Sequence, residues 1–549
     1  MKKIALCWLA LCLIALGACD QPVVVDYDDV ILETIPAARP TFTATAASGT
    51  SVRLRLGIFY EPVLDPSQAA DWESAFLVNQ LFQSLVTTDP NTGAPVPELA
   101  ESWSISEDGL IYNFTLRKDQ VWSNGRPVTS DDVVYAIRRV INPANEIGTA
   151  DTLFLIANAE HVNNLGTATQ QDLESIGVER LDDFTVRFTL QEPAAYFPSL
   201  LTLPVAKPVP AEAIEAYGED WVEPGNIITN GSFKLEAWEH QDHLLLVRNG
   251  GEPQEVIEIK TGLDPSLSLA AFQAGEVDII QVSPNMLPQL LAEPSLHEYV
   301  RTGDTLCTYL YAFNTSKSPF DSAQVRLAFV QSVDRYALTE MLFNGLYRPA
   351  KNLAPAGFFG SPALDPDFEA LAFNPERAIG FLKEAGYASG ADLPEINLYY
   401  WDNGINGEIA HILTQSWRGN LGAEVQEIGE PDLATYLQQR NDGVPNIFYY
   451  RYCGIYPDEN DMLLMGFHST KGYNRIRWSN PEFDQLVERA TRESEPSMRL
   501  ASYYQAEYLL CNREAVILPL YHEQYVFLVR PPLEPLFDMT FGLRDLKRW

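Results

Sequence analysis

Patterned apolar residues run along the whole chain after its first fifty positions. Alternation of apolar and polar residues predicts strands such as 51–59 and 185–190. Apolar positions three and four residues apart predict amphipathic helices, among them 130–141, 375–385, 481–492 and 497–511. Strands and helices interspersed over the full length predict α/β or mixed α+β lobes, and they do not fit a sandwich, a barrel or a helical bundle.

Three of the predicted helices carry start signals. Thr129 precedes Ser130 and two aspartates, which places a capping residue before acidic residues in the first turn. Asn374 and Asn480 each precede a proline and a glutamate, and proline is favoured at the first helical position. These signals fix the beginnings of the helices more firmly than their ends.

The first residues have the pattern of an export signal. Lys2 and Lys3 precede an apolar run at 4–16 that is too short to remain as a membrane span. Small residues then lead directly to Cys19, as in the cleavage site of lipoproteins, so we expect residues 1–18 to be removed and Cys19 to carry lipid. An ordinary secretory signal with a chance cysteine is the alternative. Asp20 follows, which in Gram-negative lipoproteins often means retention at the inner membrane.

Residues 19–50 lack a sustained apolar period and contain Pro36 and Pro40, so we expect a lipidated tether. No later stretch approaches the roughly 20 apolar residues of a transmembrane helix. The remainder, about 500 residues, is long enough for more than one domain. The apolar share of the whole sequence, 46%, is ample for large cores.

The charge balance is strongly acidic, with 38 Lys and Arg against 74 Asp and Glu and a formal net charge of −36. Nucleic acid is excluded as a partner because its binding needs basic patches that displace counterions. Anionic lipid headgroups would also repel this surface, so membrane association is expected to rest on the lipid alone.

Cysteine parity predicts one disulfide. Two of the six cysteines leave with the signal and Cys19 is acylated, which leaves Cys307, Cys453 and Cys511 in an oxidising compartment. Cys511 lies in an apolar run on a predicted helix and is expected to be buried and unpaired. Cys307 and Cys453 are therefore the expected pair.

Catalytic and metal-binding motifs were not found. The sequence has no G-x-S-x-G elbow, Walker loop, H-E-x-x-H or C-x-x-C. Residues 239–243 (EHQDH) are expected to form a hairpin turn rather than a metal site. The acidic residues Asp458, Glu459 and Asp461 lack the glycine and terminal glutamate of a calcium loop. We expect no metal, no cofactor and no enzymatic activity.

An ordered set of segments resembles the periplasmic oligopeptide-binding proteins, the peptide type of extracellular solute-binding protein of ABC importers. The set runs from about Arg53 to about Arg530, and its segments are 61–66 (EPVLDP), 97–103 (PELAESW), 114–117 (FTLR), 122–135 (WSNGRPVTSDDVVY), 229–235 (TNGSFKL), 272–279 (FQAGEVDI), 325–328 (VRLA) with 334–335 (DR), and 382–387 (LKEAGY). Most of these residues are expected to hold the scaffold together rather than to touch ligand.

The resemblance implies a two-lobed periplasmic-binding-protein fold with an additional middle domain and a ligand cleft between the lobes. Lobe I would comprise 51–82, 203–306 and 523–549, the middle domain 83–202, and lobe II 307–522. The chain would cross between the lobes near Leu306 and His522. These crossings would act as a hinge that lets the lobes close over a ligand. The resemblance also implies a disulfide between Cys307 and Cys453, which agrees with the pairing expected from parity.

The sequence departs from the family where the ligand's amino end is expected. The family has a segment like Trp-Cys-Ala-Asp-Tyr, whose aspartate pairs with a peptide's α-ammonium, whereas residues 452–456 here read YCGIY, so Ile455 replaces the acid. A buried ammonium without a counter-charge is costly. Either another carboxylate takes this role or the ligand has no free amine there; the candidate carboxylates are Asp71, Asp458, Glu459 and Glu523.

Other candidate ligand-binding residues also follow from the resemblance. Arg440 matches a family arginine that meets the carboxylate end of shorter peptides, and Gln281 stands where the family has a tyrosine near the ligand. Arg451 is a further difference from the family, and its side chain is expected to reach either the ligand or a surface acid. The strand and turn around Gly454 would hold the peptide main chain by strand-like hydrogen bonds. Tyr452, Tyr456 and Trp72 are either aromatic walls of the site or core.

The sequence thus predicts a lipoprotein receptor of an ABC importer, anchored in the periplasm, that binds oligopeptides or modified peptides as a monomer and delivers them to the permease. Two alternatives stay open. One is an envelope lipoprotein that senses ligand or serves as a scaffold without transport. The other is a receptor of the same fold for a non-peptide solute.

Overall fold

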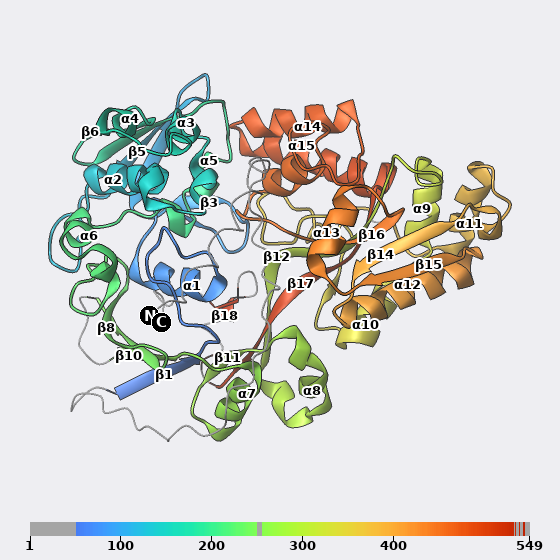
Figure 1. Ribbon diagram of the computed structural model, residues 1–549, viewed down its shortest axis with the longest axis horizontal. Coiled ribbons are helices and arrows are strands. Elements are labelled where there is room, and N and C mark those ends of the chain that lie inside the picture. The colour runs from blue at the N-terminus through green and yellow to red at the C-terminus, as the bar shows by residue number, and fades with distance from the viewer. Residues whose placement is uncertain are drawn as a thin grey trace, which may run out of the picture. The chain divides into compact units, whose positions relative to one another are not determined.

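The computed structural model describes residues 51–249, 255–369, 371–531 and 533, with two short strands at 537–538 and 542–543 (Figure 1). Within these residues, no helix has both the length and the apolarity needed to cross a bilayer. The predicted signal, Cys19 and the tether lie outside the described residues.

The elements follow one another in a mixed order of strands and helices. The strands are β1 (Ser51–Gly57), β2 (Val86–Thr88), β3 (Pro95–Pro97), β4 (Ala100–Ile105), β5 (Ile111–Leu116), β6 (Val178–Asp182), β7 (Thr185–Thr189), β8 (Phe233–Glu239), β9 (His243–Arg248), β10 (Glu255–Lys260), β11 (Ile279–Gln281), β12 (Val300–Phe313), β13 (Arg348–Pro349), β14 (Ile396–Trp401), β15 (Val425–Glu430), β16 (Ile447–Cys453), β17 (Ile517–Val529), β18 (Phe537–Asp538) and β19 (Gly542–Leu543). The α-helices are α1 (Trp72–Leu81), α2 (Ser130–Ile141), α3 (Ala159–Asn163), α4 (Gln170–Glu174), α5 (Phe197–Leu200), α6 (Ala211–Tyr217), α7 (Pro265–Ala274), α8 (Leu287–Ala292), α9 (Ala323–Gln331), α10 (Arg335–Phe343), α11 (Pro375–Glu384), α12 (Ile405–Leu421), α13 (Leu433–Asn441), α14 (Pro481–Arg492) and α15 (Pro496–Tyr508). The expected mixed α/β class is confirmed.

The predicted elements agree with the observed ones except at their ends. Helices α2 and α14 have the predicted bounds, and α11 ends one residue early. The helix expected at 497–511 is α15, which stops at Tyr508 and continues as a π-helical turn, Leu509–Arg513. The strand expected at 51–59 ends at Gly57. Residues 239–243 join β8 to β9, so the expected hairpin turn is confirmed.

One large mixed sheet contains most of the strands, in the order β15-β14-β16-β12-β17-β11-β1-β10-β9-β8, with β13 beside β17. Alternate residues of β16 belong to different cores. Tyr449 packs with Phe329, Leu382 and Trp417 of α9, α11 and α12. Tyr450 on the opposite face packs with the core that α14 and α15 complete. This part of the sheet is therefore covered by helices on both faces.

The long strands β12 and β17 lie side by side in the middle of the sheet (Figure 1). Their antiparallel ladder runs from Val300–Leu528 to Ala312–Ile517, and its register shifts twice, between Asp304 and Thr308 and between Tyr309 and Leu310. Both predicted lobe crossings, Leu306 and His522, lie at or directly beside the first of these shifts. Nothing in the ladder tests the division into three regions, which stays a prediction.

A separate four-stranded sheet, in the order β4-β5-β7-β6, belongs to the region predicted as the middle domain. Its apolar face packs on α2, where Val133 and Ile137 meet Phe114 and Phe188 in one buried cluster. The signature segment 122–135 therefore begins before this helix and supplies much of its buried face.

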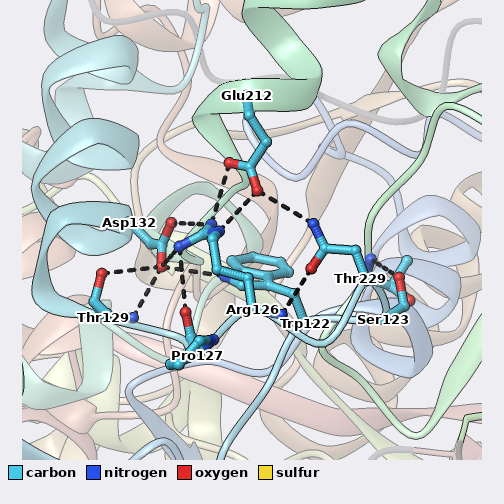
Figure 2. A network of polar contacts seen from close by, with 9 residues as sticks. Trp122, Ser123, Arg126, Pro127, Thr129, Asp132, Glu212 and Thr229 are labelled. Carbon is cyan, nitrogen blue, oxygen red and sulfur yellow. Dashed lines mark hydrogen bonds and ion pairs between the residues drawn. The ribbon is translucent and has the colours of Figure 1, made fainter.

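The polar residues of that signature segment form a structural network at the start of α2 (Figure 2). Asp132 accepts hydrogen bonds from the Trp122 indole at 3.1 Å and the Thr129 backbone N–H at 2.9 Å. Arg126 binds Asp132 at 2.6 Å and reaches Glu212 of α6 at 2.8 Å. The network ties α2 to α6, which supports a scaffold role for this segment.

Gly231 lies so close to the end of α1 that no side chain fits. A Cβ there would sit 2.3 Å from the carbonyl oxygen of Gln80 and 2.7 Å from that of Leu81. Because both neighbours are backbone atoms, Gly231→Ala is expected to lower the free energy of unfolding by about 2–4 kcal/mol. Urea denaturation measures this change.

Gly419→Ala is the matched control, because Gly419 lies in α12 with nothing within 4 Å of its would-be Cβ. That change is expected to raise the free energy of unfolding by about 0.5–1 kcal/mol. Equal effects of the two substitutions would contradict the close approach at Gly231.

Candidate functional site

The predicted ligand-binding residues concentrate on β16 and the turn that follows it. Strand β16 lies between β12 and β14, and its pairing with β14 ends at Tyr399–Phe448. Cys453, at its end, is opposite Cys307 of β12, and the two form a disulfide. The predicted pairing is confirmed, and Cys511 is a buried free thiol as expected. Burial, followed by the carboxylate of Glu507, raises the pKa of Cys511.

Two of the candidate aromatic residues are core residues. Tyr452 is 9% exposed, stacks on Tyr450 at 5.3 Å and donates a hydrogen bond to the backbone of Asp461. Tyr456 is 8% exposed and stacks on Tyr196 at 5.4 Å. The sequence left open whether these rings line the site or fill the core, and the structure favours the core.

Trp72 and Gln281 lie on the other side of the sheet's centre, near β17. Trp72 begins α1, and its ring centroid lies 5.6 Å from those of Phe76 and Phe527. Gln281 ends β11 opposite Phe527. Both residues therefore lie near Phe527 of β17. Strand β11, which carries Gln281, is separated from β16 by β17 and β12 in the strand order.

The turn after β16 has a buried backbone and an exposed apolar side chain. The Gly454 N–H donates to Leu306 O at 2.9 Å, and a Cβ on Gly454 would lie 2.3 Å from the Phe358 ring. Ile455 next to it is 66% exposed. The isoleucine that replaces the family's acid therefore has an exposed side chain.

The four carboxylates that were candidates to replace this acid all have other surroundings. Asp71 caps α1 by accepting hydrogen bonds from the N–H and hydroxyl of Ser74. Asp458 is fully buried and binds Arg499 at 2.6 Å. Glu459 is fully buried too; burial, then the nearby Glu507, raise its pKa well above the usual range. Asp458 and Glu459 therefore offer no exposed carboxylate, and Asp71 already accepts two hydrogen bonds from Ser74.

The fourth candidate, Glu523 of β17, is bound by Arg451 of β16. The two contacts, Nε to Oε1 at 2.9 Å and Nη2 to Oε2 at 3.1 Å, form a bidentate pair. The sequence left open whether Arg451 reaches the ligand or a surface acid. In the structure it binds Glu523, which was itself a candidate ligand-binding residue. The pair links β16 to β17 across β12, which lies between them.

One carboxylate near Ile455, Asp461, was considered in the sequence only as part of an acidic loop and not as a ligand-binding candidate. Asp461 is 4% exposed, and its Oδ2 accepts the Ile455 N–H at 2.6 Å. Burial raises the pKa of Asp461 to about 7, although hydrogen bonds from the backbone N–H groups of Ile455 and Tyr456 oppose this shift. The sequence gives no sign of the contact between Asp461 and the Ile455 N–H, because the family's acid stands at position 455 and Asp461 lies six residues later.

Arg440 and an unpredicted neighbour, Arg475, lie beside the earlier part of β16. The Arg440 guanidinium is 5.0 Å from the ring centroid of Tyr450 and 5.9 Å from that of Tyr436. The Arg475 guanidinium is 5.0 Å from the ring of Tyr473. Burial, followed by the charge of Arg440, lowers the pKa of Arg475.

A group of possible metal ligands lies far from these residues in the strand order. Glu239, Asp242 and His243 at the β8–β9 turn each bring one ligand atom to within 4.8 Å of the others. Glu239 and Asp242 are exposed, and His243 Nδ1 already contacts Asp242 at 2.8 Å. Exposed polar turns of this kind are common without a metal, and no metal is assigned here.

Replacing Asp461 by asparagine tests its buried charge. The folded protein holds the Asp461 proton more tightly than the unfolded chain does, so this carboxyl stabilises the fold near pH 5 and loses that contribution as pH rises through about 7. Relative to the unsubstituted protein, Asp461→Asn should therefore gain ~1–3 kcal/mol in unfolding free energy between pH 5 and pH 8. Urea titrations at several pH values measure the difference, and a difference that does not change with pH would contradict the shift.

Comparison with known proteins identifies the family. The family model described as "Bacterial extracellular solute-binding proteins, family 5 Middle" matches residues 94–474. The chain is 30% identical over 479 residues to the periplasmic oligopeptide-binding protein OppA of Escherichia coli, covering 85% of this chain and 86% of that protein. It is 29% identical over 515 residues to the probable deoxycholate-binding periplasmic protein YgiS of Escherichia coli, covering 91% and 94%.

Among solved structures, the unliganded open form of the Escherichia coli murein tripeptide-binding protein MppA matches with a TM-score of 0.81 at 28% identity. The match covers 91% of this chain and 98% of that one. The family resemblance and the fold are thereby confirmed together. The chain belongs to family 5 of the bacterial extracellular solute-binding proteins.

Proposed function

We propose that this protein is the solute-binding component of an ABC importer, that it binds oligopeptides or modified peptides, and that it delivers them to the permease. The observation that carries the proposal is the similarity to the oligopeptide-binding protein, which extends over 85% of this chain. The similarity to the structure of a murein tripeptide-binding protein supports the same ligand class. The relatives are named as binding proteins, and we propose a binding role without catalysis.

Two lobes joined through β12 and β17 would close over the ligand. The register shift between Asp304 and Thr308 supports a hinge there, because unpaired positions bend more readily than a regular ladder. Ligand contacts made only in the closed state would supply the free energy of closure. Arg440 would bind an anionic end of the ligand, and the turn at Gly454 and Ile455 would face the other end.

The mature protein would be anchored to the periplasmic face of the inner membrane through lipid on Cys19. The tether at 19–50 would let a monomeric body reach the permease. The acidic body itself has no electrostatic attraction to anionic headgroups, since its formal net charge is −36. Neighbouring permease and ATPase genes would support import, whereas their absence would favour a sensor or scaffold.

A non-peptide solute is the second candidate function. The relative named as a probable deoxycholate-binding protein covers 91% of this chain. Deoxycholate is an apolar carboxylate without an amine, and the exposed Ile455 favours such a ligand over one with an ammonium at this position.

Native mass spectrometry of protein purified from its host is the direct test of the ligand class. We expect co-purified peptides that are released when the fold is opened by mild denaturant. Arg440→Gln should reduce the bound fraction at least tenfold relative to Arg489→Gln, a control on the exposed side of α14. A preparation that carries only non-peptide solutes would overturn the peptide assignment and leave the family unaffected.

Removing the disulfide should loosen the site more than it unfolds the protein. Cys307 and Cys453 join β12 to the end of β16, directly before the turn at Gly454. The double variant Cys307→Ser, Cys453→Ser is expected to weaken ligand binding at least tenfold while circular dichroism stays unchanged. A peptide mass map that placed the disulfide on Cys511 would refute the assignment.

A further inference from the structure

The region predicted as the middle domain, residues 83–202, contacts predicted lobe II, although both ends of this region lead into predicted lobe I. The Ala195 N–H donates a hydrogen bond to Thr491 O at 2.7 Å. The Tyr196 ring stacks on the Tyr456 ring, with centroids 5.4 Å apart and planes 10° apart. Two parts of the chain without a direct covalent connection are therefore held together here.

The packing around this stack is as close as in a protein interior. A Cβ on Gly93 would lie 2.4 Å from the backbone nitrogen of Phe359. Tyr456 follows β16, yet it belongs to the buried cluster of the four-stranded sheet. Arg499 Nη1 reaches Ala195 O at 3.4 Å. We call this set of residues the cross-region contact: Gly93, Ala195 and Tyr196 on one side, and Phe359, Tyr456, Thr491 and Arg499 on the other.

Residues 83–202 are also fastened to predicted lobe I. Arg139 of α2 binds Asp65 at 2.5 Å, and both side chains are largely buried. The ammonium of buried Lys207 donates to the Ser84 hydroxyl at 2.7 Å. Residues 83–202 are therefore expected to move with lobe I, so the cross-region contact joins the lobe I side of the molecule to lobe II.

The cross-region contact begins close to the predicted crossings between the lobes. Thr308 of β12 is paired with His522 of β17, so the two crossing strands are about 5 Å apart. The Gly454 N–H donates to Leu306 O at 2.9 Å, and Tyr456 is two residues further along, a chain reach of roughly 7 Å. Two strands so close together allow twisting as well as bending, and a contact beside them restrains the twist.

We propose that the cross-region contact is a third, non-covalent hinge point, and that Tyr196 is a positioning residue of the ligand site. Positions near a rotation axis move least, so the stack persists while the remainder of lobe II rotates. Through Tyr456, Tyr196 holds the adjoining turn at Gly454 and Ile455 in place relative to lobe I. The lobes then approach along one path, and less conformational freedom is lost when a ligand binds. This inference rests on the proposed function, because it assumes lobes that close over a ligand.

The test measures how far the lobes wander in the ligand-free, full-length protein. Dyes are attached to azide-bearing amino acids at Ala216 of α6 and Gln415 of α12, which are exposed positions on predicted lobes I and II. Single-molecule energy transfer gives the distribution of inter-dye distances. Tyr196→Ala is expected to widen this distribution at least twofold, because it removes the stack that restrains twisting.

Three further variants assign the effect to the stack. Tyr196→Phe keeps a ring and should keep the width of the unsubstituted protein. Tyr196→Leu keeps apolar volume without a ring that can stack, so it should widen the distribution and replaces Tyr196→Ala if that variant does not fold. Phe154→Ala is the matched control, since Phe154 is another partly buried ring packed on the same cluster. It should leave the width unchanged, and thermal unfolding establishes that each variant is folded.

Three outcomes would overturn the inference. One is an unchanged width in folded Tyr196→Ala or Tyr196→Leu. The second is a shift of the whole distribution to shorter distances without widening, which would make the cross-region contact a latch that holds the lobes apart. The third is equal widening by Phe154→Ala, which would assign the effect to loosening of residues 83–202 as a whole. The measurement needs no ligand, so its result is independent of the ligand class, which native mass spectrometry tests.

Discussion

The pairing of β12 with β17 is the constraint on which the site depends. These two strands are the only path by which the large sheet continues, within the described residues, from β11 and β1 to β16 and β14. Hydrogen bonds along both halves of the ladder fix the strands firmly, and the register shift between Asp304 and Thr308 is where they are least regular. Bending is easier at such an irregularity, because the regular ladder of hydrogen bonds is interrupted there.

The covalent and ionic links of the site attach to this pair of strands. The disulfide joins β16 to β12 at Cys307, within one residue of the predicted crossing at Leu306. The Arg451–Glu523 pair joins β16 to β17 next to the other predicted crossing, His522. Burial raises the pKa of Asp304 on β12 to about 6, while Arg348 and Gln524 oppose that shift. The disulfide and the ion pair therefore attach the end of β16 to β12 and β17, the two strands that carry the predicted crossings.

Sequence reasoning reached the family, the disulfide and the starts of the four helices it predicted, because each depends on local or ordered signals. The cap at Thr129 and the prolines at 375 and 481 identify helix starts directly, whereas the end of α15 turns into a π-helical turn that no local residue announces. The site was harder. Arg451 and Glu523 are 72 residues apart and gave no sign of pairing, and Asp461 and Arg475 act through neighbours brought close by the fold. A single sequence shows which residue types are present, and tertiary contacts decide which of them are already neutralised.

That distinction changes the electrostatic character of the site. Three acids that follow β16 carry little exposed charge: Asp458 is buried and bound by Arg499, Glu459 is buried, and burial raises the pKa of Asp461 to about 7. Arg440 and Arg475 remain charged and unmatched by the described carboxylates. In the proposed site, an anionic ligand group beside Arg440 would meet a cation, whereas an ammonium beside Ile455 would meet an exposed isoleucine side chain. Net charge describes the surface of this protein, and the pairing of individual groups determines what its site selects.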